Sequence, residues 1–100
     1  MTHEKQRDTV TVHLSGDLDH SAAMKIRQEL DVLLADPGVR RLVFDLSGLG
    51  FMDSSGIGMM IGRYKMMTRR GGSVAVRPGS RQVDRLMELS GLYQIIEKLA

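Results

Sequence analysis

A chain of 100 residues, 42% of them hydrophobic, is long enough to form one compact domain around a single core. It has no cysteine, which excludes disulfides and thiolate chemistry and fits a reducing compartment such as the cytoplasm. The first eight residues are polar, unlike a signal peptide, and no apolar run approaches the length of a membrane span. The sequence therefore predicts one cytoplasmic domain over residues 1–100 without membrane contact.

The formal net charge of +2 is unevenly distributed along the chain. Residues 1–62 carry six Lys or Arg against nine Asp or Glu, whereas residues 63–100 carry eight against three. A basic half is one signature of nucleic-acid binding. Only Tyr64 and Tyr93 accompany these charges, however, and two scattered tyrosines form no platform for base stacking. We interpret the basic residues, Arg63 included, as a solvated face.

The first predicted strand covers residues 9–15, where apolar and polar side chains alternate. The alternation indicates a half-exposed strand at or near a sheet edge, and the polar residues before it could pair as a short additional strand. Residues 16–20 break the pattern and are expected to form a loop. Asp19 or Ser21 then caps a helix that runs to about Ala35.

A central strand is predicted over residues 39–46, because its apolar centre is continuous, as in a strand covered on both faces. Residues 47–50 are expected to form a loop. The second helix should begin at Ser54 or Ser55 and end near Arg70, before two glycines. Gly58 and Gly62 lie four residues apart in it, a spacing that would let a neighbouring backbone approach closely.

The remaining elements are a strand over residues 73–77 and a helix that begins at a Ser80 cap and ends at Gly91. Residues 92–96 have no clear periodicity. Strands and helices thus alternate, which predicts an α/β domain with a mixed, mostly parallel sheet of about four strands and helices packed on it. If the first two strands are parallel neighbours, the segments around Asp19 and Asp53 meet at one end of the sheet.

The serine pair Ser54-Ser55 lies at a predicted helix start, where free backbone N–H groups and the helix dipole favour an anion. Two interpretations stay open on the residues alone. A serine here can cap the helix, or it can accept a phosphate while Asp53 or Ser54 serves as the cap. In the second case Ser55 has the free hydroxyl, and its phosphate would add to the negative charges of Asp19 and Asp53.

Other chemistries have less support in the sequence. The serine motif lacks the Gly-x-Ser-x-Gly elbow of hydrolases. The histidine that could reach the site as a general base is His20, a single histidine in a predicted loop. Asp17, Asp19 and Asp53 match no known spacing of metal ligands. Gly56 and Gly58 match neither the P-loop nor the dinucleotide-binding fingerprint. We therefore expect no catalytic residue, metal or cofactor.

Three segments resemble one protein family over nearly the whole chain. Residues 51–58 (Phe-Met-Asp-Ser-Ser-Gly-Ile-Gly), followed by residues 62–65 (Gly-Arg-Tyr-Lys), resemble the signature of anti-sigma factor antagonists, which are single-domain STAS proteins. Residues 16–20 resemble that family's Gly-Glu-Leu-Asp-His loop, with Asp17 in place of the glutamate. Residues 89–92 (Leu-Ser-Gly-Leu) match the end of its third helix. The resemblance implies a STAS-type fold without catalytic activity.

The resemblance also implies a phosphorylation switch. The anti-sigma factor, an ATP-dependent serine kinase, would phosphorylate Ser55 and bind only the unmodified form, and a serine phosphatase would reverse the modification. Asp19, Asp53, Ser54, Ser55 and Gly56 are the expected partner-binding residues. Two alternatives remain: a STAS subunit of another signalling or transporter-associated complex, and a basic nucleic-acid-binding domain.

One departure from the family concerns the C-terminus. Family members continue past the position of Lys98 into a further helix, whereas this chain ends at Ala100. The last helix is therefore expected to be short or absent, which would expose apolar surface at Ile95, Ile96 and Leu99.

Overall fold

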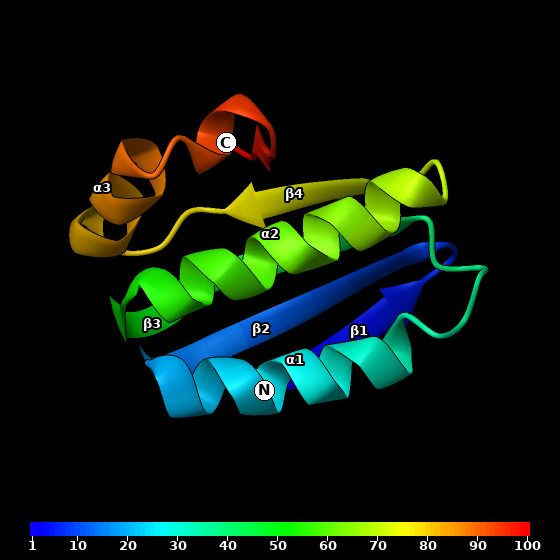
Figure 1. Cartoon of the computed structure of the whole chain (residues 1–100), viewed down its shortest axis with the longest axis horizontal. Helices are drawn as coiled ribbons and strands as arrows, with labels where there is room; N and C mark the ends of the chain where they lie inside the picture. Colours follow the sequence, from blue (N-terminus) through cyan, green and yellow to red (C-terminus); the bar gives the residue numbers. More distant parts are fainter.

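The order of the strands in space follows their order in the sequence, β1-β2-β3-β4-β5 (Figure 1). The computed structural model describes residues 1–100. Its elements are β1 (Thr2–Gln6), β2 (Thr9–Leu18), α1 (His20–Leu33), β3 (Arg41–Met52), α2 (Ser54–Arg69), β4 (Ser73–Arg77), α3 (Arg81–Leu89), the 3-10 helix η1 (Leu92–Gln94) and β5 (Glu97–Lys98). Only β1 and β2 are antiparallel. The predicted α/β class with a mostly parallel sheet is confirmed, with a two-residue fifth strand beyond the four expected.

Strand β2 lies next to the edge of the sheet, as predicted, but it is longer than predicted. β1 forms the edge of the sheet, so β2 is an inner strand, and the short preceding strand is confirmed. β2 also continues through the predicted loop to Leu18, because Gly16 adopts a φ of 78° and the pairing with β3 shifts register before Ser15 and again after Gly16. A bulge of this kind adds residues to a strand without ending it.

Strand β3 likewise continues through the expected loop at residues 47–50 and ends at Met52. Gly48 lies opposite Ser15 of β2, and a Cβ atom at Gly48 would come within 2.8 Å of the carbonyl oxygen of Leu14. The glycine therefore permits close pairing of the two strands at this point. As a consequence, β2 and β3 extend side by side and end at the same edge of the sheet.

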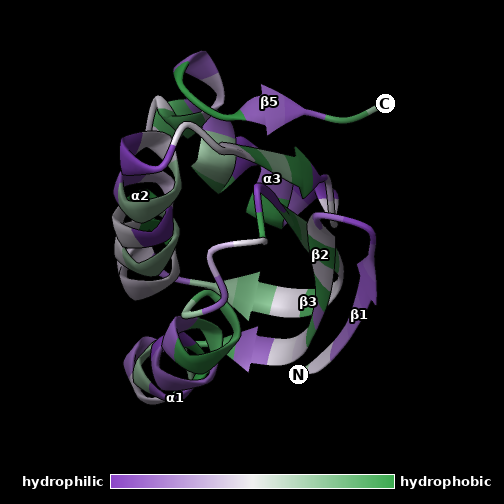
Figure 2. Ribbon diagram, turned by 90° about the vertical axis from the view of Figure 1, so that its right-hand side faces the viewer, coloured by the Kyte–Doolittle hydropathy of each residue, from purple (hydrophilic) through white to green (hydrophobic).

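Helices α1 and α2 lie on one face of the sheet, side by side (Figure 2). The strand side chains that face them are fully buried and form the centre of the core: Val10, Val12, Leu14, Leu42, Phe44, Leu46, Val74 and Val76. The methionines of α2 contribute as well, since Met59, Met60 and Met67 are buried. These three side chains therefore belong to the core.

Arg70, which follows α2, fixes the end of this helix to the turn after α1. Its guanidinium donates hydrogen bonds to the carbonyl oxygens of Leu34 at 2.6 Å, Asp36 at 3.1 Å and Val39 at 3.2 Å. Hydrogen bonds from a charged guanidinium to backbone carbonyls are stronger than those between neutral groups. Arg70 therefore holds α1 and α2 together at the end opposite to their N-termini.

The opposite face of the sheet carries a polar network centred on His13. Its Nδ1 lies 2.7 Å from Asp45 and its Nε2 2.8 Å from Glu4, one carboxylate on each side of the ring. The hydrogen bonds with Glu4 and Asp45 raise the pKa of His13 above its ordinary value. Burial alone would raise the pKa of Asp45, but hydrogen bonds from Ser47 and His13 lower it overall.

The raised pKa of His13 predicts a pH-dependent contribution to stability. A histidine whose pKa is higher in the folded protein contributes its full stabilisation of the fold at pH values below the unfolded pKa of about 6.5. That contribution is lost as the pH rises through the folded pKa. We therefore expect wild type to exceed the variant His13→Gln in free energy of unfolding by more at about pH 6 than at about pH 9. Urea unfolding of both proteins at the two pH values measures the difference, and a pH-independent gap would contradict the network.

The C-terminal segment is joined to α3 by polar contacts. The Tyr93 hydroxyl donates to Asp84, and the Lys98 ammonium lies 3.0 Å from the same carboxylate and 4.8 Å from the centre of the Tyr93 ring. Ile96 belongs to the core with 2% of its surface exposed, so the expectation that it would be exposed is wrong. Ile95 is exposed, as expected.

Candidate functional site

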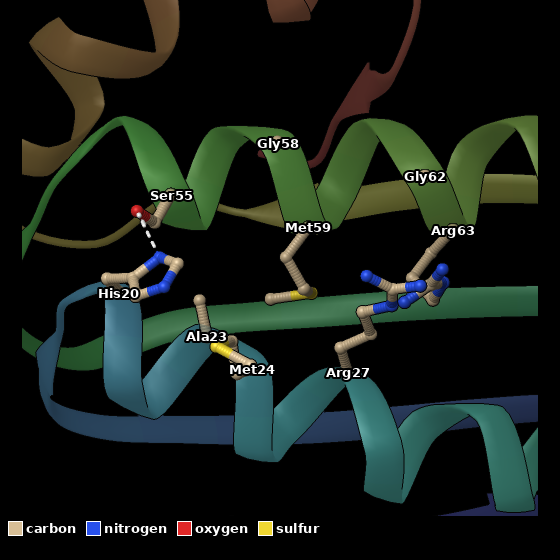
Figure 3. A pocket seen from close by; sticks show the side chains of 9 residues that line it. All are labelled: His20, Ala23, Met24, Arg27, Ser55, Gly58, Met59, Gly62 and Arg63. Atoms are coloured by element: carbon tan, nitrogen blue, oxygen red, sulfur yellow. Dashed lines mark hydrogen bonds between the residues drawn. The ribbon is translucent and has the colours of Figure 1, made fainter.

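The ends of β2 and β3 bring the two predicted loops together. The strands are parallel neighbours, Leu18 pairs with Met52, and the Asp53 N–H donates to the Leu18 carbonyl oxygen at 3.2 Å. Helices α1 and α2 begin immediately afterwards, so their N-termini lie at the same edge of the sheet (Figures 1 and 3). The predicted meeting of the Asp19 and Asp53 segments is confirmed.

Each of the two helices is capped by an aspartate. The Asp19 carboxylate accepts a hydrogen bond from the Ala22 N–H at 2.9 Å, and the Asp53 carboxylate accepts one from the Ser55 N–H at 2.8 Å. Asp19, and not Ser21, is therefore the N-cap of α1. Asp53, and not Ser54, is the N-cap of α2. Ser54 is exposed as the first residue of α2. Neither serine hydroxyl is used as a cap.

Ser55 is half-buried in the first turn of α2, and its hydroxyl faces α1. The Ser55 Oγ lies 3.4 Å from the His20 Nδ1, so a histidine reaches the site from the first residue of α1 (Figure 3). The next residue, Gly56, is buried, and a Cβ there would come within 2.7 Å of Met52 and 2.9 Å of Leu18. Gly56 therefore lets the start of α2 lie close to the strand ends, which fixes the position of Ser55.

The site shows no arrangement suited to a bound metal ion. The molecule contains no group of three or more His, Cys, Asp or Glu side chains placed to hold one. None of its helices has the combination of length and hydropathy that a bilayer crossing requires. What the site does offer is the Ser55 hydroxyl, which does not cap the helix, between the two helix starts that Asp19 and Asp53 cap. The dipole of α2 favours an added anion at this end.

A groove of about 380 Å³ extends from Ser55 along the space between α1 and α2 (Figure 3). Its lining residues are His20, Ala23, Met24, Arg27, Ser55, Gly58, Met59, Gly62 and Arg63. A Cβ at Gly58 or at Gly62 would meet no atom within 4 Å. The expectation that these glycines bring a neighbouring backbone close is therefore wrong: they leave the side of the groove open.

Arg63 lies at the far end of the groove and is buried, with 7% of its surface exposed. The interpretation of this residue as part of a solvated face is wrong. Its Nη1 lies 3.4 Å from the Asp31 carboxylate of α1, and its Nε and Nη1 have no hydrogen-bond partner. The helical period contained the signal, since Arg63 follows Met59 by four residues and precedes Met67 by four, on the buried side of α2.

The open space beside Gly58 predicts a stabilising substitution. Gly58→Ala adds a methyl group without a clash and removes the entropic cost of glycine in a helix, so we expect the free energy of unfolding to rise by about 0.5–1 kcal/mol. Chemical denaturation of wild type and variant measures the change. A loss of stability would show that α1 and α2 lie too close together for the added methyl group.

The whole chain, residues 1–100, matches the family model of the STAS domain. Two curated relatives are an anti-sigma F factor antagonist from Paenibacillus polymyxa and an anti-sigma-B factor antagonist from Bacillus subtilis. The first is 39% identical over 93 residues, which are 93% of this chain and 80% of the relative. The second is 32% identical over 94 residues, which are 94% of this chain and 84% of the relative. The chain belongs to the STAS-domain family of anti-sigma factor antagonists.

Solved structures agree with this assignment. The unphosphorylated form of the anti-sigma factor antagonist SpoIIAA superimposes with a TM-score of 0.87 at 29% identity, covering 99% of this chain and 87% of that one. The phosphorylated form of the Bacillus cell fate determinant SpoIIAA gives a TM-score of 0.78 at 28% identity, covering 99% and 90%. The fold predicted from the sequence resemblance is thereby confirmed.

Proposed function

We propose that this protein is a phosphorylation-controlled antagonist of an anti-sigma factor. In its unmodified form it binds the anti-sigma factor, which releases the sigma factor for transcription. The anti-sigma factor is also an ATP-dependent serine kinase that modifies Ser55 and so ends the interaction, and a serine phosphatase restores the unmodified form. The protein acts by binding in the cytoplasm, without catalytic activity of its own.

The observation that carries this proposal is the environment of Ser55. Ser55 is half-exposed, and its hydroxyl does not cap the helix, because the carboxylate of Asp53 fills that role. The relatives support the same function, since they are antagonists of anti-sigma factors, and one SpoIIAA structure is of a phosphorylated form. They include antagonists in both the sigma F and the sigma B systems, so the proposal names the class of partner and not one sigma factor.

Phosphosite mapping tests the proposal directly. The protein is incubated with ATP and the anti-sigma factor kinase of the source organism, and the modified residue is identified by mass spectrometry. We expect one phosphate on Ser55, retained in Ser54→Ala and absent from Ser55→Ala. Phosphate on Ser54, or none on either serine, would contradict the assignment.

Asp19 provides a second test, because it is exposed beside Ser55 and yet caps α1. Asparagine caps helices about as well as aspartate, so we expect Asp19→Asn to change the free energy of unfolding by less than about 0.5 kcal/mol. Loss of the charge should nevertheless weaken binding to the anti-sigma factor. Calorimetric titration beside thermal unfolding separates the two effects, and equal affinity of variant and wild type would remove Asp19 from the interface.

A further inference from the structure

The groove between α1 and α2 has two chemically different ends. Ser55 and His20 form one end, near the aspartate caps, whereas Arg27 and Arg63 form the other (Figure 3). Ser55 and Arg63 are eight residues apart on α2, or about 12 Å along the helix axis. The two ends can therefore be contacted at once by a single segment of a partner protein.

The arginine end of the groove carries one more positive charge than negative charge. Asp31 is the one carboxylate close to both guanidiniums, 3.4 Å from Arg63 and 4.0 Å from Arg27. Two positive charges thus share one negative charge. Arg63 Nη1 and Asp31 Oδ1 face each other at 3.4 Å without forming a hydrogen bond, and the buried Nε of Arg63 has no partner either, which is unfavourable for a charged group. An incoming anion at this end would complete the set of charges.

The middle of the groove is suited to apolar contact. Met24 of α1 is 50% exposed beside it, although methionine is a residue that generally prefers burial. Gly58 and Gly62 add no side chain to the facing side of α2, where Met59 supplies an apolar one. A partner's backbone or apolar side chain can therefore approach α2 closely here.

We propose that the groove receives a segment of the anti-sigma factor that carries an Asp or Glu side chain, whose carboxylate pairs with Arg27 and Arg63. The proposal rests on the proposed function, which it extends by naming the chemistry of the contact. A carboxylate is favoured by the unbalanced pair of guanidiniums, because arginine binds carboxylates through parallel N–H bonds. The apolar middle of the groove favours a protein segment over a small anion. Phosphorylation of Ser55 then places its charge at the other end of the same binding groove.

A charge reversal on α1 tests this proposal against a matched control. Arg27 and Lys25 are both exposed on α1, but only Arg27 lines the groove. We expect Arg27→Glu to weaken binding to the anti-sigma factor of the source organism at least about tenfold, and Lys25→Glu to change it by less than about threefold. Equal losses in both variants would indicate general electrostatic steering and would overturn the proposal.

Zero-length crosslinking identifies the carboxylate itself. In Arg27→Lys the introduced amine can form an amide with a carboxylate in direct contact, and carbodiimide treatment of the complex followed by mass spectrometry locates the bond. We expect a crosslink from position 27 to an Asp or Glu of the anti-sigma factor. A complex that forms without this crosslink would overturn the proposal, as would a homodimer of this chain that Arg27→Glu dissociates.

The same experiments separate this inference from the function on which it rests. Failure of the unmodified wild-type protein to bind the anti-sigma factor would overturn the proposed function, and the groove contact with it. Normal wild-type binding, unaffected by Arg27→Glu, would overturn the groove contact alone.

Discussion

Phosphorylation of Ser55 is expected to lower the affinity for the anti-sigma factor about 100-fold or more. The phosphate adds a charge of about −1.5 to −2 at neutral pH beside the carboxylates of Asp19 and Asp53. Like charges brought together in an interface cost several kcal/mol, and each 1.4 kcal/mol corresponds to about tenfold in affinity. The bulk of the phosphate also separates surfaces that would otherwise touch at the start of α2.

Calorimetric titration of the anti-sigma factor with unmodified and Ser55-phosphorylated protein, at one ionic strength, measures this loss. Ser55→Ala is the matched control: it should bind about as well as unmodified protein, and incubation with ATP should not change its affinity. Phosphorylated protein that binds within about threefold of the unmodified form would contradict a charge-based switch.

Gly79→Ala should strongly destabilise the protein, although it adds only one methyl group. Gly79 lies between β4 and α3, where a Cβ would overlap the carbonyl oxygen of Leu46 and come within 3.3 Å of the Leu46 Cβ. The obstacle is backbone in the centre of the sheet, which cannot move aside as a flexible side chain can. Overpacking of this kind costs about 1–3 kcal/mol, and we expect at least about 2 kcal/mol here.

Urea unfolding of Gly79→Ala and Gly58→Ala makes this a matched comparison. Both substitutions add one methyl group, yet we expect opposite signs, a loss at position 79 and a gain at position 58. Equal effects would mean that the intrinsic properties of glycine, and not the surroundings of each Cβ, determine the outcome.

The order of strands and helices could be predicted from hydrophobic periodicity, and the capped helix starts from their Asp and Ser residues. The lengths of β2 and β3 could not, because Gly16 and Gly48 normally indicate turns and here lie in paired strands. Whether such a glycine ends a strand depends on the partner strand, which lies more than thirty residues away in the sequence.

The candidate site, like the fold, could be predicted from the sequence only in part. The motif around Ser55 and the meeting of the two loops followed from the sequence, whereas the contact with His20 depends on the relative rotation of α1 and α2. The groove was missed because it results from two glycines facing open space. The burial of Arg63 could be predicted from its spacing of four residues from Met59 and Met67, but its partner Asp31 could not, because it belongs to another helix.

Phosphorylation of Ser55 should change the binding surface without refolding the domain. The dipole of α2 favours an anion at its N-terminus, and Ser55 is half-exposed there, so nothing in the core has to move. Backbone amide chemical shifts of unmodified and Ser55-phosphorylated protein test this most directly. We predict changes confined to the segment around Asp19 and to residues 53–58. Widespread changes through β3 and α3 would indicate a global conformational switch and would contradict the local electrostatic account.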